Sequence, residues 1–536
     1  MLKRRWFLYL TEFFSGMSVM AIELGASRLL APYFSSSQII WTIIIGAIMI
    51  AMALGNIWGG RLADKNPSPD KMYFRILIVA VWTAAIPFVG KYVIAGVSLM
   101  LALLGGSNFL IWASLLSCIL LFVFPLMLLG SVSPALVKYA VKSLDENGKI
   151  VGELNALNTV GSIIGTFTPT FITIPAVGTA WTFIIFAAIL LAIALTYFVT
   201  ERRRLVSVSV MTALAIAFSA LASLSTFSFN PNSYEDESIY NYLRVEEDDR
   251  QIILSTNVLI GVQSITKKDS PLAGNYNYNY GSISPVYYDF GLAAPYMAGA
   301  ENKDQMDVLV LGMGTGTFAA ECYNYFDNSV IEGVEIDEKI INLAYDRFGL
   351  PKDDRIKCVE FDARAYLRGA GKYDVIMVDA YRDITVQFQL SSAEFFSEVK
   401  SHLTKNGVML LNLNMTSASE NSINDYLCDT VDLVFDSVYT AQAGGNIVVF
   451  ASDNPNFVED FRASYELDLE KDDRFLSLMY YVDAVLTKYE GGDRILTDDK
   501  APVELLGMKV VDELITEQLE LNFSNISIDQ LLDMIK

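Results

Sequence analysis

The stretch "VLVLGMGTGTFAAE" spans residues 308–321 and decides how the C-terminal half of the chain folds. Its first four residues belong to an apolar run of the kind found in a buried β-strand. Gly312, Gly314 and Gly316 follow, and a helix-like pattern begins after them. Because glycine lets a backbone approach a ligand closely, this strand and turn are typical of a site that holds a nucleotide or nucleoside.

Strands and helices alternate beyond this turn. Apolar strands alternating with helices predict a mostly parallel, Rossmann-like α/β sheet that binds ligands at the carboxyl ends of its strands. The expected strands cover residues 307–312, 330–337, 356–363, 373–380 and 407–414, with two late strands near 434–440 and 446–451.

Acidic residues stand at the ends of three successive strands. Glu335, 23 residues after Gly312, can accept hydrogen bonds from both ribose hydroxyls. Asp362 can accept one from an adenine amino group, with Ala363 supplying a backbone N–H. The turn and these acids together predict a nucleoside site, although strand-end acids also cap helices. The full set of acids is Glu335, Asp337, Asp362 and Asp379, the last standing where the reacting end of the ligand would lie.

Composition divides the chain into two parts. Residues 1–224 consist of long apolar runs with a basic balance, whereas the remainder is acidic and brings the net charge to −22. An acidic soluble part excludes nucleic acid as a natural partner, because phosphate contacts need Lys and Arg. The four cysteines lack paired or metal-site spacing, and the single histidine, His402, excludes a His-rich metal site, so no metal is expected.

The apolar part predicts a helical transmembrane domain of seven or eight spans, since about 20 apolar residues cross a bilayer. Residues 92–106 form a shorter run, either an eighth span or a helix lying in the interface. The seven candidate spans are about 6–30, 39–60, 72–90, 109–130, 153–177, 179–199 and 205–223.

The positions of the basic residues favour an external C-terminal half, whereas the expected chemistry favours a cytosolic one. Lys and Arg cluster near the N-terminus and in the loops 61–71, 138–149 and 202–204, which favours the cytosolic side of the membrane for all four segments. This placement makes 92–106 non-spanning. It gives seven spans and puts the C-terminal half outside the cell. A nucleoside made in the cytosol instead requires a cytosolic domain and an eighth span. We provisionally expect a multi-pass protein of the cell membrane whose soluble part is cytoplasmic.

Four domains are expected along the chain. Their bounds are 1–225 for the transmembrane helices, 235–300 for a small β unit with a substrate-site loop, 301–455 for the nucleoside-binding catalytic domain and 456–536 for a helical extension. Residues 270–284 are rich in Asn, Tyr, Gly and Ser, which predicts a loop that could close over the site. Its alternating tyrosines are Tyr276, Tyr278 and Tyr280.

Residues 240–450 resemble class I S-adenosylmethionine-dependent transferases and, more specifically, spermidine synthases. The motifs that carry the resemblance are "IGVQS" (260–264), "VYYDF" (286–290), "GVEID" (333–337), "FDARAYL" (361–367) and "YDVIMVDAY" (373–381). The apolar half and "ILTDDKAPVELL" (495–506) look like members of this family that are fused to a major-facilitator-like membrane part.

The resemblance implies roles for individual residues. It places Gln263 at the ribose, Asp379 as the catalytic base, and Tyr287 and Asp289 in the amine site. Tyr288 or Tyr381 would assist proton removal. The turn would contact the donor through Gly312, Gly314, Thr315 and Gly316, together with Glu335, Asp337, Asp362 and Ala363.

Two departures from the family pattern concern the reaction. The family's turn is Gly-Gly-Gly-Asp-Gly, and its Asp holds the aminopropyl ammonium of decarboxylated S-adenosylmethionine. Met313 and Thr315 stand at the middle Gly and the Asp. After Asp379 the usual Ser-Ser-Asp-Pro is replaced by residues 380–383, in which Asp383 is the candidate second acid of the amine site.

We therefore expect a membrane-integral transferase that moves the aminopropyl group of decarboxylated S-adenosylmethionine to a small amine, a step of polyamine biosynthesis. With Thr315 in place of an acid, S-adenosylmethionine itself could be the donor, for methyl transfer or sulfonium cleavage. A non-catalytic nucleoside sensor or a transport component are the alternatives from other classes. Transport by so few spans would require an oligomer, such as a dimer.

Overall fold

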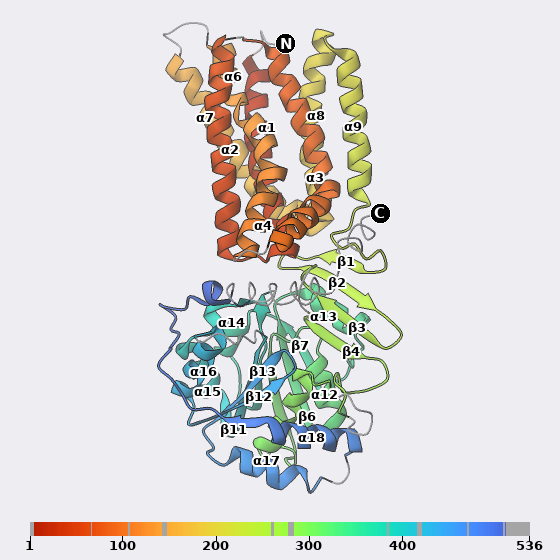
Figure 1. Ribbon diagram of the computed structural model, residues 1–536, viewed down its shortest axis with the longest axis vertical. Coiled ribbons are helices and arrows are strands. Elements are labelled where there is room, and N and C mark those ends of the chain that lie inside the picture. Colours follow the sequence, from red (N-terminus) through yellow and green to blue (C-terminus); the bar gives the residue numbers. More distant parts are fainter. Residues whose placement is uncertain are drawn as a thin grey trace. The chain divides into compact units, whose positions relative to one another are not determined.

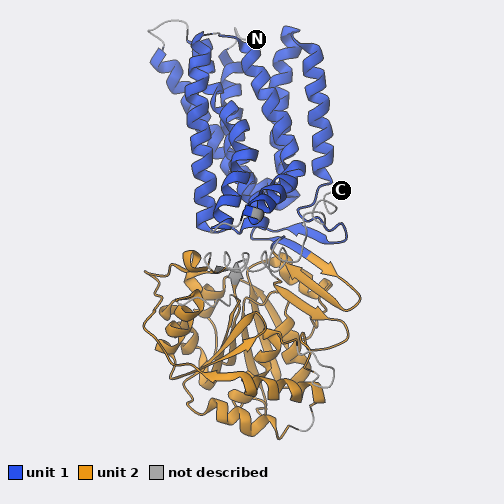
Figure 2. Cartoon of the chain, viewed as in Figure 1, with its two compact units in different colours: residues 1–244, 257–259 blue, residues 245–256, 260–536 orange. Residues whose placement is uncertain are grey.

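A computed structural model of the chain describes residues 5–65, 67–104, 108–141, 147–258, 262–276, 284–382, 385–414, 421–468, 471–507 and 510. They belong to two compact units, shown in different colours in Figure 2. Unit 1 comprises Met1–Arg244 and Asn257–Leu259, and unit 2 comprises Val245–Thr256 and Ile260–Lys536.

Unit 1 is a bundle of long apolar helices (Figure 1). Two short π-helical turns, Ile119–Val123 and Pro169–Thr173, continue α4 into α5 and α7 into α8. The helices are α1 (Arg5–Phe34), α2 (Gln38–Lys65), α3 (Pro69–Leu104), α4 (Phe109–Cys118), α5 (Phe124–Gly130), α6 (Val132–Ala140), α7 (Asn147–Thr168), α8 (Ile174–Glu201) and α9 (Leu205–Ser223).

Helices α1 and α7 approach each other closely because glycines stand where they meet. A Cβ atom added at Gly161 would lie 2.0 Å from the carbonyl oxygen of Phe13, and one at Gly165 would lie 2.0 Å from that of Met17. Small residues at such positions let two backbones pack in contact, which apolar helices use in place of larger interlocking side chains.

Two features of the structure bear on the expected spans. Six described segments are long and apolar enough to cross a membrane, and one of them is the 55-residue segment Asn147–Glu201. This segment is broken at Gly178, where φ is 81° and ψ is 174°, between the expected spans 153–177 and 179–199. Residues 92–104 are not a separate helix, because α3 runs without interruption through Pro87 to Leu104.

Unit 2 is built on an eight-stranded sheet in the order β14-β12-β13-β11-β8-β5-β6-β7. A four-stranded sheet in the order β1-β2-β3-β4 precedes it in the chain. The strands are β1 (Tyr234–Glu237), β2 (Tyr242–Glu247), β3 (Gln251–Ser255), β4 (Ser264–Lys267), β5 (Met306–Leu311), β6 (Ser329–Glu335), β7 (Ile356–Glu360), β8 (Tyr373–Val378), β11 (Leu403–Leu413), β12 (Ser437–Ala443), β13 (Asn446–Ser452) and β14 (Leu486–Lys488).

The predicted strands of the large sheet are all present, and the predicted parallel core is confirmed. Strands β7, β6, β5, β8 and β11 are mutually parallel, whereas β13, β12 and β14 continue the sheet antiparallel. Leu311 at the end of β5 is in register with Val334 on one side and Val378 on the other. The ends of β6 and β8 therefore flank the end of β5.

Helices cover both faces of the large sheet. One face carries a continuous apolar core that includes Phe290, Tyr296, Phe318, Phe461 and Phe475, all buried. Two short helices, α10 and α11, follow β4 in the chain. The helices of unit 2 are α10 (Tyr287–Phe290), α11 (Ala294–Met297), α12 (Thr317–Tyr325), α13 (Glu338–Asp346), α14 (Ala363–Leu367), α15 (Ala393–Ser401), α16 (Ile423–Val434), α17 (Phe457–Tyr465) and α18 (Asp473–Val485).

The contact between α1 and α7 can be tested with a pair of glycine substitutions in α7. Gly165→Ala should lower the melting temperature of the detergent-solubilised protein, because its methyl group would overlap the Met17 carbonyl and cost about 1–3 kcal/mol. Gly152→Ala, where an added Cβ has nothing within 4 Å, should not lower it. Equal melting temperatures for the two variants would contradict this account of the packing.

Candidate active site

The site forms around the turn that follows β5, and this turn depends on glycine. Gly312, Gly314 and Gly316 have φ values of 83°, 57° and 78°, which residues other than glycine rarely adopt. A Cβ atom at Gly312 would lie 2.5 Å from the Cα of Ala380. The end of β5 is thus pressed against the end of β8, at the point of the sheet where α/β proteins bind ligands.

Met313 and Thr315 both point away from solvent. The Met313 side chain packs against Gly333 of β6, and its sulfur lies 3.5 Å from the Cys358 thiol. Thr315 is only 2% exposed, and its N–H lies 3.3 Å from the Ser264 hydroxyl oxygen. Among the described residues the Thr315 hydroxyl has no hydrogen-bond partner.

Glu335 ends β6 and is tied to the glycine turn. One carboxylate oxygen accepts a hydrogen bond from the N–H of Gly314 at 3.0 Å and the other from the N–H of Asp337 at 3.1 Å. The side chain is buried, and this burial raises the pKa of its carboxyl. Each oxygen keeps a second lone pair with which it can accept a ligand hydroxyl.

Asp337 and Asp362 act as helix caps. The Asp337 carboxylate accepts a hydrogen bond from the Lys339 N–H at 3.1 Å and begins α13. The Asp362 carboxylate accepts one from the Ala365 N–H at 2.8 Å and begins α14 at Ala363. Asp362 is exposed, whereas Asp337 is buried. Both therefore show the helix-capping role, which is the alternative to ligand binding as the reason for an acid at the end of a strand.

Asp379 follows β8 and lies in a network of hydrogen bonds. Its carboxylate accepts from the Tyr287 hydroxyl at 2.7 Å and from the side-chain amide of Asn412 at 2.8 Å. The Asn446 amide in turn donates to the Asn412 side-chain oxygen at 2.8 Å. Burial raises the pKa of Asp379 to about 7, with the charge of Glu335 acting in the same direction, while the hydrogen bonds from Asn412 and Tyr287 oppose the rise.

The tyrosine that contacts Asp379 is Tyr287, whereas the sequence led us to assign the assisting role to Tyr288 or Tyr381. The Tyr288 hydroxyl donates instead to the backbone carbonyl of Gln263, and its ring lies 3.9 Å from the Tyr287 ring. Helix α10 begins at Tyr287, and so consecutive side chains leave it in different directions. The backbone of Tyr381 lies in β9 (Tyr381–Arg382), paired with β10 (Thr385–Val386).

Asp289 is fully buried and holds the first part of the predicted loop at 270–284. Its carboxylate accepts hydrogen bonds from the N–H groups of Ala273 and Gly274 and from the Tyr276 hydroxyl, at 2.8, 2.6 and 2.6 Å. Burial raises its pKa and that of the neighbouring Glu321. Tyr278, Tyr280 and Asp383 lie outside the described residues.

Sequence reasoning missed two residues of this site. Asn412 and Asn446 stand on β11 and β13, and Asn412 supplies the second hydrogen bond to Asp379. A polar residue inside the apolar run "GVMLLNLN" was the available signal. Among the described residues no group of three or more His, Cys, Asp or Glu side chains could hold a metal ion.

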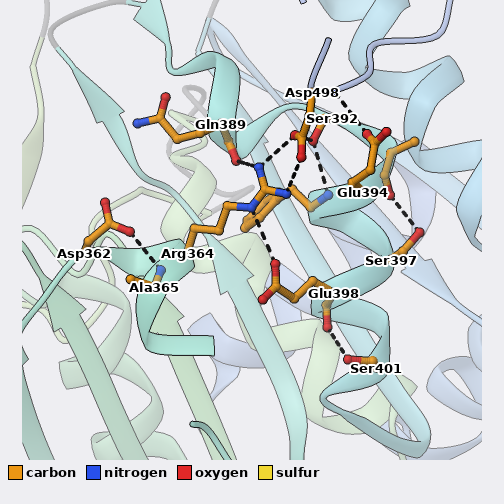
Figure 3. Close-up of polar contacts among 12 residues, drawn as sticks. Asp362, Arg364, Ala365, Gln389, Ser392, Glu394, Ser397, Glu398, Ser401 and Asp498 are labelled. Atoms are coloured by element: carbon orange, nitrogen blue, oxygen red, sulfur yellow. Dashed lines mark hydrogen bonds and ion pairs between the residues drawn. The ribbon is translucent and has the colours of Figure 1, made fainter. Parts of the chain in front are cut away.

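The segment near residue 498 is fixed to the helix that follows Asp362 (Figure 3). The Arg364 guanidinium donates two hydrogen bonds to the Asp498 carboxylate, both at 2.8 Å, and one to the Gln389 carbonyl at 2.9 Å. Ser392 also donates to Asp498, at 2.5 Å. The hydrogen bond from Arg364 lowers the pKa of Asp498. A paired, charge-assisted contact of this kind fixes geometry as well as adding stability.

The chain is similar to a known protein family over much of its C-terminal half. Residues 295–458 match the spermine/spermidine synthase domain family. A probable polyamine aminopropyl transferase from Bifidobacterium longum is 41% identical over 347 residues, which make up 61% of this chain and 74% of the relative.

Two further proteins share only part of the chain. The human eEF1A lysine and N-terminal methyltransferase is 31% identical over 153 residues, or 26% of this chain and 22% of that protein. A crystal structure of a probable spermidine synthase from Corynebacterium glutamicum aligns with 50% of this chain and 99% of its own, at 18% identity and a TM-score of 0.36.

The Arg364 contact can be tested by hydrogen exchange. Arg364→Met should speed exchange of the amides of Leu496 and Asp498 by about tenfold or more, because hydrogen bonds to charged groups contribute about 1.5–3 kcal/mol. Lys357→Met is the matched control, since it removes an ion pair to Glu332 whose lysine side chain is 69% exposed. Unchanged exchange in Arg364→Met would show that other contacts hold the segment.

Proposed function

The chain belongs to the spermine/spermidine synthase family, and on this premise we propose that it transfers the aminopropyl group of decarboxylated S-adenosylmethionine to a small amine. It is accordingly a transferase. The observation that carries the proposal is the Asp379 carboxyl, which stands beside the glycine turn and Glu335 with a pKa of about 7. A base with a pKa near the working pH is well suited to take a proton from an amine.

In the proposed reaction the acceptor amine binds beside Asp379. Its nitrogen attacks the carbon next to the sulfonium, a new N–C bond forms, the C–S bond breaks, and the nucleoside leaves as a neutral thioether. The proton released by the amine passes to Asp379. Tyr287 and Asn412 orient the carboxylate, so that much of the rate comes from positioning the reactants.

The donor would lie across the ends of β5, β6 and β8. Glu335 would accept hydrogen bonds from the ribose, the turn at 312–316 would lie against the sulfonium end, and Asp362 and Ala363 would contact the adenine. Gln263 would complete the ribose contacts, with Tyr287, Asp289 and Asp383 at the acceptor end. These roles follow the family resemblance, and the adjacent ends of β5, β6 and β8 support those given to the turn and to Glu335.

S-adenosylmethionine itself is the second candidate donor, with methyl transfer as its reaction. Thr315 favours it, because a neutral residue in place of an acid does not repel the donor carboxylate. Calorimetric titration with both nucleosides separates the two: tighter binding of the decarboxylated form supports aminopropyl transfer, and tighter binding of S-adenosylmethionine supports the second candidate. Binding of neither would remove both.

Unit 1 is proposed to cross a lipid bilayer. Its surface carries large apolar side chains, among them Met49 at 66%, Phe171 at 69% and Val206 at 81% exposed. Soluble proteins rarely expose apolar patches of more than a few hundred Å². Lipid tails would cover these side chains on α2, between α7 and α8, and on α9.

Asp379→Asn should lower kcat with putrescine as acceptor by about 10²–10⁴-fold, because the base is lost. In the parent enzyme kcat should rise with pH to a midpoint of about 7 and then level off, since only ionised Asp379 accepts a proton. The variant should lose this dependence. Turnover that survives the substitution with an unchanged pH profile would rule out Asp379 as the base.

Tyr287→Phe and Tyr288→Phe form a matched pair. The first removes a hydrogen bond that stabilises ionised Asp379, and so it should move the midpoint of the pH profile upward by about one unit. The second removes a hydroxyl that contacts the Gln263 carbonyl and should leave the midpoint in place. A shift in Tyr288→Phe alone would reverse the assignment.

A further inference from the structure

Basic side chains gather at one end of the helical bundle. Apart from Arg28 and Lys91, every Lys and Arg between residues 1 and 230 lies near the N-terminus or within 61–75, 138–149 and 202–204. Ion pairs connect three of these segments, because Lys138 contacts Asp64 at 3.0 Å and Arg203 contacts Asp70 at 2.9 Å.

The start of α1 and the start of α7 belong to the same basic end. The Tyr9 hydroxyl donates to the Glu153 carboxylate at 2.5 Å, and Lys149 lies 3.9 Å from the same carboxyl group. Figure 1 shows the start of α1, the end of α2, the start of α3, the α8–α9 connection, the end of α6 and the start of α7 together at the top of the bundle.

The chain leaves the bundle at the other end. The Tyr33 hydroxyl, at the end of α1, donates to the Phe227 carbonyl at 2.6 Å. Thr179, at the start of the straight part of α8, donates its N–H to the Glu237 carboxylate at 2.7 Å. The segment after α9 therefore lies against the bundle end farthest from the basic connections, all within unit 1.

The two remaining cations of this region belong to that other end, and the protein itself holds them. The Arg28 guanidinium donates to the Ile239 carbonyl, and the Lys91 ammonium donates to the Ser228 carbonyl at 3.4 Å. The connection 35–37 at this end reads "SSS" and contains no Lys or Arg. Nearly all the Lys and Arg residues of this region therefore belong to one end of the bundle, and only Arg28 and Lys91 belong to the other.

The number of crossings follows from two features of the helices. The unbroken α3 leaves no separate helix at 92–104 to serve as an eighth crossing. The break at Gly178 turns Asn147–Glu201 back on itself. Glu153 near its start contacts Tyr9, and Tyr197 near its end contacts Asp70, both at the basic end, while Thr179 contacts the other end. The bundle thus begins at one end and finishes, after α9, at the opposite one.

We infer that the basic end of unit 1 lies at the cytosolic surface of the membrane, against anionic lipid head groups, and that unit 2 is extracytosolic. The inference rests on the proposed crossing of the bilayer by unit 1. Lys and Arg in short connections stay on the cytosolic side during insertion, and anionic lipids of that leaflet attract them. An odd number of crossings then carries the rest of the chain to the other side.

This orientation constrains the chemistry of the proposed transferase. Its sulfonium nucleoside is made in the cytosol, so a transport step must supply the donor to unit 2. The acceptor amine would be taken from, and the alkylated amine released into, the extracytosolic space. The arrangement opposes our expectation of a cytoplasmic domain, which required a crossing that α3 does not provide.

Labelling of one introduced cysteine at a time on intact cells tests the orientation. Glu459→Cys places a thiol on exposed α17 of unit 2, and Arg202→Cys places one at the basic end. The parent chain sets the baseline, because its described cysteines Cys118, Cys322 and Cys428 are buried and Cys358 is half-buried. A membrane-impermeant maleimide should label the Glu459→Cys variant directly and the Arg202→Cys variant only after the cells are permeabilised.

Three results would overturn the inference: labelling at 202 but not at 459 on intact cells, labelling of both only after permeabilisation, or recovery of the full chain in the soluble fraction. Activity of the detergent-solubilised full chain toward putrescine is measured in parallel and is independent of orientation. A solubilised enzyme that turns over while labelling contradicts the orientation leaves the proposed function standing. Correct labelling without turnover under either donor removes the function alone.

Discussion

The ends of β5 and β8 approach so closely that only hydrogen fits on the α-carbon of residue 312. A side chain there would meet the backbone of Ala380 at 2.5 Å. This contact sets the turn of 312–316 directly beside Asp379 and brings Gly314 to the Glu335 carboxylate. The glycine turn, Glu335 and Asp379 therefore form one rigid group, held by the hydrogen bonds of three parallel strands.

Electrostatics within this group favour a proton on Asp379 near neutral pH. Removal of its carboxyl from water and the proximity of Glu335 disfavour the charged form, while Tyr287 and Asn412 keep that form accessible. The balance suits a residue that must take up and release a proton in each cycle. The same sheet supplies both influences, since Glu335 ends β6 and Asn412 belongs to β11, the neighbour of β8.

Sequence alone predicted the features that follow from local rules. The strands, the glycine turn and the acids at 335, 362 and 379 follow from periodicity and from the shared direction of parallel strands. The sequence could not distinguish Tyr287 from Tyr288 as the partner of Asp379. Adjacent side chains on a one-turn helix point in different directions, and the packing of that helix decides which one faces Asp379. Asn412 and Asn446 were missed because their hydrogen-bond partners are distant in sequence. Residues 92–104 were expected to be a separate segment, but they belong to α3 because the helix continues past Pro87.

Arg364 and Asp498 are 134 residues apart in the chain, yet they meet beside the helix that Asp362 caps. During synthesis every strand-end acid of the site emerges from the ribosome well before the segment that clamps α14. A nascent chain that ended before residue 498 would possess the glycine turn, Asp379 and Tyr287, but its helix α14 would lack this support. Only a chain translated through residue 498 can therefore hold α14 by this pair of hydrogen bonds.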